Sequence, residues 1–189
     1  QRVALHRSYA IGGHSEDEHF SAVAHLSRHL GESTAETCNT YNMLKLTRRL
    51  FLRDADPARI EFYERGLFNH ILASQDPATG MVTYYVALKP GAWRSYSTPE
   101  DSFWCCVGTG MENPARYGET IYARQGDALL VNLFLASALT WQEKGLRLRQ
   151  ETRFPDEERT RLVLRLDREA RFALRLRRPA WAGEGFAAT

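Results

Sequence analysis

The spacing of apolar residues changes near residue 120, and this change constrains the fold more than any other feature. Before that point apolar residues recur every three or four positions, as on one face of a helix. After it, stretches such as LRLRQETRF (146–154) alternate apolar and polar residues, as strands do. Helices followed by strands favour an α+β fold with two segregated regions over alternating β-α-β units. We therefore predict a helical domain over residues 1–119 and a β-domain over residues 120–189.

Several elements of each region can be predicted individually. Ser33 and Glu36 stand at capping-box spacing before an apolar run, and Pro57 suits the first turn of the next run. MVTYYVAL (81–88) is short and rich in residues that favour strands. We predict helices over 19–30, 33–57, 57–75 and 108–122. We predict two strands around a turn at 126–127 and further strands within 146–154, 160–167 and 171–181.

Composition and charge exclude some classes of partner. Of the 189 residues 25% are charged, but the formal net charge is only +2, and arginine is spread along the chain rather than clustered. We therefore expect no nucleic-acid partner. No window approaches the roughly 18 apolar residues of a membrane span, so no membrane partner is expected either. Because the sequence opens at Gln1 in mid-pattern, we expect it to be part of a longer protein. Its location is left open: free thiols favour the cytoplasm, and the periplasm or secretion remain alternatives.

The chain contains three cysteines, namely Cys38 and the adjacent pair Cys105 and Cys106. Three is too few for a disulfide scaffold, and two adjacent cysteines close a strained ring if they pair. Neighbouring thiols in a glycine-rich segment can instead hold one cation, and zinc takes thiolate and carboxylate ligands in a tetrahedron. Together with Glu36, which precedes Cys38 by two residues, the three thiols supply four ligands.

Other interpretations stay open on spacing and chemistry alone. The spacing matches no standard zinc motif, and Glu36 is also suited to satisfy the amides at a helix start. Isolated cysteines are commonly inert core residues. The segment GGHSEDEHF (12–20) gathers imidazoles and carboxylates, which are typical either of helix-dipole partners or of ligands and acid–base groups.

Four stretches carry a resemblance to a known family: GGHSEDEHF (12–20), AETCNTYNMLKLTRRLF (35–51), YERGLFNHILASQDPATGMVTYYVALKPG (63–91) and FWCCVGTGMEN (103–113). Together they resemble the zinc-dependent β-L-arabinofuranosidases, bacterial enzymes of glycoside hydrolase family 127 and its relatives. The match runs in order over residues 10–120. The later stretch LRLRRPAWA (174–182) resembles the domain that follows in that family. The resemblance implies the last helices of an (α/α)6 toroid followed by an antiparallel β-sandwich.

The resemblance also implies roles for individual residues. Cys105 falls on the nucleophile of a retaining glycosidase, and it is also a ligand of the Zn²⁺ cofactor. The other implied zinc ligands are Glu36, Cys38 and Cys106. Glu18 falls on the general acid/base, with Glu16 as a competing neighbour. The residues expected to contact the sugar or to support the site are Glu64, Tyr85 and His14.

The implied partners follow from this family. The substrate is expected to be an L-arabinofuranoside of plant glycans, and the chain is expected to need a missing N-terminal part of the same protein, because a full toroid requires more helices. The chain alone is therefore expected to be inactive, and a homodimer is a further expectation. The alternative is a non-catalytic module that is stabilised by zinc or active in thiol redox chemistry and that binds carbohydrate or protein. A disulfide between Cys105 and Cys106 is a further alternative.

Overall fold

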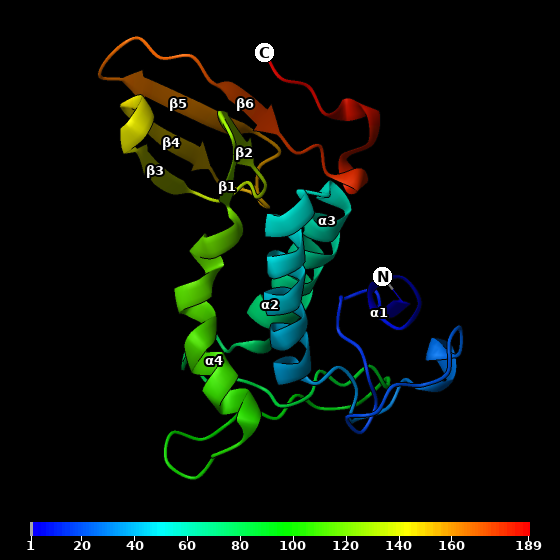
Figure 1. The fold of residues 1–189 in the computed structure, drawn as a ribbon. Coiled ribbons are helices and arrows are strands. Elements are labelled where there is room, and N and C mark those ends of the chain that lie inside the picture. Colours follow the sequence, from blue (N-terminus) through cyan, green and yellow to red (C-terminus); the bar gives the residue numbers. More distant parts are fainter. Residues whose placement is uncertain (1) are drawn as a thin grey trace. The chain divides into compact units, whose positions relative to one another are not determined.

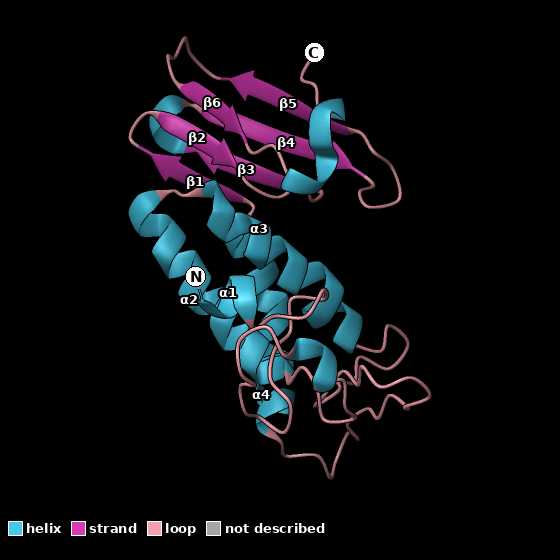
Figure 2. Ribbon diagram, turned by 90° about the vertical axis from the view of Figure 1, so that its right-hand side faces the viewer, coloured by secondary structure: helices cyan, strands magenta, loops and turns pink. Residues whose placement is uncertain are grey.

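A computed structural model describes residues 2–189, which divide into two compact units, one ending at Ala115 and the other beginning at Arg116 (Figure 1). Within the described residues every α-helix begins in the first unit, and every strand lies in the second (Figure 2). The predicted order of helices followed by strands is therefore confirmed. Over the same residues, no helix is both long enough and apolar enough to cross a membrane.

The first unit is built on two helices, at residues 37–54 and 57–66, that pack side by side. Its α-helices are α1 (Arg2–His6), α2 (Thr37–Asp54), α3 (Pro57–Gly66) and α4 (Cys105–Arg116). A π-helical turn at Leu67–Ile71 and a 3-10 turn at Leu72–Ser74 continue α3. The helices predicted within 33–57 and 57–75 are thus present.

Local chemistry explains the corner between α2 and α3. Ala55 ends α2 in the left-handed region at φ 52°, and the Asp56 side chain caps α3 by accepting a backbone hydrogen bond at 3.0 Å. Pro57 occupies the first turn, where its missing N–H has no helical partner to lose. Gly66 then allows close packing, because a Cβ there would lie 3.2 Å from a methyl group of Leu44 on α2.

The helix predicted over residues 19–30 is wrong. Only Leu26–Arg28 form a short 3-10 turn, and Ala24 adopts φ 65°, which interrupts a right-handed helix. The apolar residues of the expected stripe remain substantially exposed at Phe20, Val23 and Leu30. Helix stability comes mainly from burying an apolar face, and this short segment buries too little of one.

The starts of two helices also differ from expectation. Glu36 is the N-cap residue of α2, and its side chain makes no hydrogen bond to a helix amide. The capping box with Ser33 is therefore wrong. The helix predicted over 108–122 begins earlier, at Cys105, and gives way to a 3-10 turn at Tyr117–Thr120. Residues 81–88 form isolated bridges rather than a strand.

The second unit is a pair of three-stranded sheets. Its strands are β1 (Tyr122–Gln125), β2 (Ala128–Val131), β3 (Ser137–Trp141), β4 (Leu146–Thr152), β5 (Thr160–Leu166) and β6 (Ala173–Leu176). The sheet orders are β1-β2-β6 and β3-β4-β5. Leu129 of the first sheet is buried in one cluster with Trp141, Leu146 and Leu148 of the second. The two sheets therefore share one apolar core.

One strand pair differs from the expected antiparallel sandwich. β6 runs parallel to β2, whereas β1 pairs with β2 in the antiparallel sense. A parallel pair needs a long crossover connection, and here the whole sheet β3-β4-β5 forms the connection from β2 to β6. Alternation of apolar residues predicts strands but not their direction, so this difference could not be read from the pattern.

Burial in β4 makes a test of this core possible. Leu148 is 1% exposed, so Leu148→Ala should lower the free energy of unfolding by about 2–5 kcal/mol through the cavity that it leaves. The matched control is Leu164→Ala, because Leu164 faces Leu148 across the strands but is 39% exposed. Leu164→Ala should lower the free energy of unfolding by less than half as much as Leu148→Ala. Urea unfolding followed by tryptophan fluorescence measures both, and equal losses would contradict the assigned core.

Candidate active site

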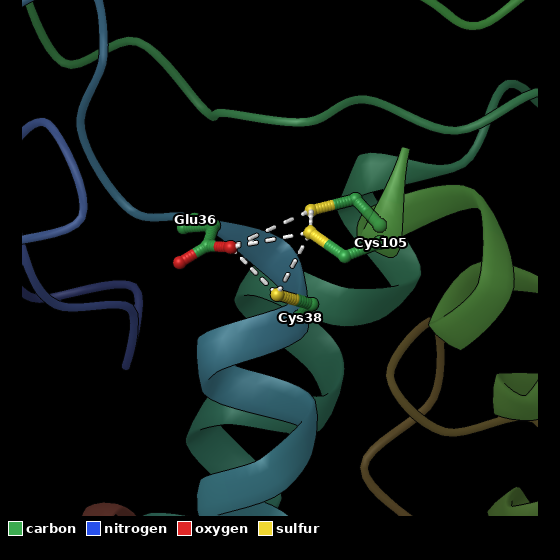
Figure 3. Close-up of side chains that lie close together, drawn as sticks. Glu36, Cys38 and Cys105 are labelled. Carbon is green, nitrogen blue, oxygen red and sulfur yellow. Dashed lines mark hydrogen bonds between the residues drawn. The ribbon is translucent and has the colours of Figure 1, made fainter. Parts of the chain in front are cut away.

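Two helix starts bring the proposed ligands together. Glu36 is the N-cap of α2, Cys38 lies in its first turn, and Cys105 and Cys106 open α4. In Figure 3 the side chains of Glu36, Cys38 and Cys105 point toward one another. Cys38 and Cys105 are 67 positions apart in the chain, so the site depends on tertiary packing.

The distances within this cluster are short. The Oε1 atom of Glu36 lies 2.6 Å from the Cys38 sulfur, 3.5 Å from that of Cys105 and 4.0 Å from that of Cys106. The Cys105 sulfur lies 3.4 Å from that of Cys38 and 3.8 Å from that of Cys106. All four ligand atoms lie within 4.8 Å of one another. The three cysteines are free thiols, so the structure contains no disulfide between Cys105 and Cys106.

The donor set and its spacing fit a small thiophilic dication. A tetrahedral ion with metal–sulfur bonds of about 2.3 Å holds its sulfurs roughly 3.8 Å apart, which is close to the separations observed. Thiolate and carboxylate ligands select soft or borderline ions such as zinc. The Glu36–Cys38–Cys105–Cys106 cluster can therefore hold a metal ion.

Backbone contacts hold the two helix starts in place. Residues 83–86 run beside residues 34–37: the Thr37 amide donates to the Tyr84 carbonyl at 2.9 Å, and the Thr37 hydroxyl donates to the Thr83 carbonyl at 3.0 Å. On the other side, Gly110 of α4 lies so close to Val82 that a Cβ would come within 2.8 Å of a methyl group. Residues 82–86 thus link the two halves of the cluster.

The electrostatics of the cluster disfavour negative charge in the absence of a cation. Burial raises the pKa of the Cys38 thiol, and the hydrogen bond to the Glu36 carboxylate raises it further. Burial also raises the pKa of the Cys106 thiol to about 11. Both thiols are consequently protonated in neutral solution unless a cation displaces their protons.

Glu18 approaches the cluster through a pair of tyrosines. The Tyr84 hydroxyl donates to Oε1 of Glu18, and the Tyr85 hydroxyl lies 3.4 Å from the same oxygen. The Tyr84 hydroxyl also lies 3.7 Å from the Cys105 sulfur. Glu16 faces elsewhere, because its carboxylate pairs with His29 at 2.7 Å. The geometry therefore favours Glu18 over Glu16 as the carboxylate of the site.

Tyr84 lies beside the cluster although the sequence analysis did not name it, because only its neighbour Tyr85 was expected to serve the site. The hydrogen bond to Glu18 is the main reason that the pKa of Tyr84 is raised, whereas burial is the main reason that the pKa of Tyr85 is raised to about 12. The tyrosine doublet itself was the available signal. A doublet in extended chain does not reveal which ring faces the site.

His14 and Glu64 are both buried. His14 is 0% exposed, and its Nε2 atom hydrogen-bonds to the side-chain oxygen of Asn39 at 2.9 Å. Asn39 follows Cys38 on α2. Burial lowers the pKa of His14. Glu64 lies in α3 and is 4% exposed. In this structure neither presents its side chain at the surface, and their expected contact with a sugar stays a prediction.

Family models match both units of the chain. The catalytic domain of the GH127 β-L-arabinofuranosidases matches residues 1–119, and the GH127 middle domain matches residues 128–189. The chain belongs to glycoside hydrolase family 127. The resemblance of the four sequence stretches to this family is thereby confirmed. Among curated proteins, no sequence matches the chain.

Solved structures of GH127 proteins share the fold of this chain. A GH127 β-L-arabinofuranosidase from Geobacillus stearothermophilus T6 is 21% identical with a TM-score of 0.73, over 95% of this chain and 30% of that one. A second GH127 β-arabinofuranosidase is 25% identical with a TM-score of 0.80, over 95% and 28%. A structure described as a glycoside hydrolase is 19% identical with a TM-score of 0.73, over 96% and 35%. This GH127 chain thus spans about a third of their length.

The raised thiol pKa values predict how metal binding depends on pH. Because Cys38, Cys105 and Cys106 must each lose a proton to become a ligand, the affinity for Zn²⁺, used as the probe, should rise by up to about 1,000-fold per pH unit between pH 6 and 8. Competition with a chromophoric chelator measures it. Cys38→Ser removes one of these protons, so the rise should fall to no more than about 100-fold per pH unit. An affinity that is independent of pH would contradict the assigned ligands.

Proposed function

We propose that the protein carrying this GH127 chain is a retaining β-L-arabinofuranosidase that acts on plant glycans. In this proposal Cys105 is the nucleophile, Glu18 is the general acid/base, and Zn²⁺ is held by Glu36, Cys38, Cys105 and Cys106. One observation carries the proposal. An exposed thiol at the edge of the Glu36–Cys38–Cys105–Cys106 cluster is linked to an exposed carboxylate by a single hydroxyl group.

Accessibility supports Cys105 as the nucleophile. Cys106 is 1% exposed and Cys38 is half-buried, whereas Cys105 is exposed. An attacking atom must reach the anomeric carbon of a bound sugar, and only the Cys105 sulfur combines exposure with a position beside Glu18. Cys38 and Cys106 instead serve as ligands that hold the site together.

The chemistry divides into two displacements. When bound, zinc would lower the pKa of the thiol and keep Cys105 as a thiolate at neutral pH. The Cys105 sulfur forms a bond to the anomeric carbon while the glycosidic C–O bond breaks, and the Glu18 carboxyl gives its proton to the leaving oxygen. The Glu18 carboxylate then takes a proton from water, whose oxygen attacks the anomeric carbon as the C–S bond breaks. Two inversions give net retention, as in two-carboxylate glycosidases.

The substrate class rests on the family. Both family models that match this chain describe β-L-arabinofuranosidases, and two of the similar solved structures carry arabinofuranosidase names. An L-arabinofuranoside is accordingly the substrate proposed here. Activity screening of the full-length protein against a panel of aryl glycofuranosides, with and without a zinc chelator, tests this directly. Turnover of no arabinofuranoside would overturn it.

A thiol-redox function is the second candidate. It is favoured by the 3.4 Å separation between the sulfurs of Cys38 and Cys105. A modest movement of the two side chains would bring these sulfurs to the distance of a disulfide bond. The two candidates differ in their need for Glu18, because a redox pair does not use that carboxylate.

Substitution of the nucleophile gives a sharp prediction. Cys105→Ser in the full-length protein should lower kcat by at least about 1,000-fold, because a serine hydroxyl at this position is a poor nucleophile. Zinc should still bind through the three remaining ligands, with lower affinity. The matched variant Cys106→Ser should lose zinc affinity as well as activity. Elemental analysis and aryl-glycoside assays measure these effects, and wild-type rates for Cys105→Ser would exclude Cys105 as the nucleophile.

The choice between two neighbouring carboxylates can be tested in the same way. Glu18→Gln should reduce kcat/KM by about 100- to 10,000-fold for substrates with poor leaving groups, because general acid catalysis is lost. Glu16→Gln should reduce it by less than about fivefold, since Glu16 pairs with His29 outside the cluster. Steady-state kinetics on an alkyl arabinofuranoside compare the two. A larger loss for Glu16→Gln would reverse the assignment, and normal cleavage by Glu18→Gln would exclude Glu18 as the general acid.

A further inference from the structure

A single tyrosine hydroxyl lies between the two groups that the proposed reaction requires. The Tyr84 hydroxyl donates a hydrogen bond to Oε1 of Glu18, and the Cys105 sulfur lies 3.7 Å from the same hydroxyl oxygen. These groups come from three separate parts of the chain: the loop before residue 20, the segment 82–86 and the first turn of α4. Tyr84 is the point where the three meet.

We propose that Tyr84 is a positioning residue, whose hydroxyl holds the carboxyl group of Glu18 at a fixed distance from the sulfur of Cys105. This inference rests on the proposed function and deepens it. In retaining glycosidases the acid/base and the nucleophile must stay about 5–5.5 Å apart so that one bound sugar can meet both. A hydroxyl in contact with both groups sets such a separation directly.

Glu18 needs an external restraint. Its side chain is exposed, and it stands in a loop where Ser15, Asp17 and Glu18 all adopt positive φ, at 77°, 46° and 65°. Left-handed backbone orients the loop, but it does not select one rotamer of an exposed carboxylate. The two tyrosine hydroxyls are the contacts that the structure shows for the Glu18 side chain.

Tyr84, in contrast, is held firmly. Its carbonyl accepts hydrogen bonds from the Thr37 amide at 2.9 Å and from the Cys106 thiol at 3.7 Å. Its ring packs against Tyr85 at 4.6 Å and meets the edge of Trp104 at 5.9 Å between centroids. The ring therefore has neighbours on two sides, and its hydroxyl has a defined place.

Tyr85 does not make the same pair of contacts. Its hydroxyl is 3.4 Å from Glu18, at the long limit for a hydrogen bond, and its backbone pairs with Glu36. A hydroxyl has one proton to donate and two lone pairs. The Tyr84 hydroxyl can thus donate to Glu18 while it accepts from the Cys105 thiol, and it faces both groups when the thiol has lost its proton.

The test compares two leaving groups in the zinc-loaded, full-length protein. The first step is reported by kcat/KM, and it needs a proton from Glu18 only when the leaving group is poor. Tyr84→Phe should lower kcat/KM for methyl β-L-arabinofuranoside by about 10- to 100-fold. For the 2,4-dinitrophenyl glycoside, which departs without a proton, the loss should stay below about threefold. Equal losses on both substrates, or no loss on either, would overturn the positioning role.

Two controls separate positioning from structural damage. Tyr96→Phe removes a hydroxyl from the same loop region, but that hydroxyl contacts Arg94 and no member of the site, so both rates should be unchanged. Zinc content and the thermal midpoint of Tyr84→Phe should match those of the wild type, since the ring and its packing remain. A fall in either would assign the effect to structure rather than to Glu18.

A double variant tests whether Tyr84 acts through Glu18. In a Glu18→Gln background, Tyr84→Phe should lower kcat/KM for the methyl glycoside by less than about twofold, because the group it positions is gone. Independent, multiplicative losses would contradict the inference. If the wild type cleaves neither glycoside, the proposed function itself fails. If the wild type cleaves both glycosides and Tyr84→Phe lowers kcat/KM equally for both, only the positioning role fails.

Discussion

The crowding of one carboxylate and three sulfurs around a single point is the constraint on which the rest of the site depends. Four anion-forming groups whose ligand atoms lie within 4.8 Å of one another are costly to ionise together: burial is the main reason that the pKa values of Cys38 and Cys106 are raised, and the neighbouring charges of the cluster raise them further. A bound dication would stabilise the ionised forms, because each negatively charged group is then attracted to the cation. The same ion would provide the exposed Cys105 with the charge that a nucleophile needs.

The scaffold meets this constraint by joining two helix starts through one extended segment. Residues 82–86 hydrogen-bond to the start of α2 through the backbone, and the Val82 side chain packs against Gly110 of α4, so this one segment contacts both helices that carry the ligands. The same segment carries Tyr84. The groups proposed to bind metal and the group proposed to orient the acid therefore share a single support.

Much of this arrangement could be predicted from residue types and spacing. The helices at 37–54 and 57–66 follow apolar periodicity and a proline at the first turn, and β4 and β6 follow the alternation of apolar and polar residues. The chemistry of paired thiols near a carboxylate suggested the cluster of Glu36 with the three cysteines, and the resemblance to family 127 implied it, whereas spacing alone left a helix cap and inert thiols as alternatives. The helix expected over 19–30 failed because its apolar stripe finds no surface to cover in this chain. The expectation of antiparallel pairing was wrong for β6, because alternation carries no information on strand direction.

The sequence by itself determined the order of helices followed by strands and named the candidate donors, because both depend on local patterns. The resemblance to family 127 had already named Glu18 and Cys105, but only the tertiary structure shows how neighbouring side chains differ: Glu18 rather than Glu16 contacts the tyrosines, Tyr84 rather than Tyr85 lies beside the sulfur, and Cys105 is exposed while Cys106 is buried. Neighbouring residues have the same local chemistry, and their side chains differ only in direction. That direction is set by contacts with segments tens of residues away, which no local pattern encodes.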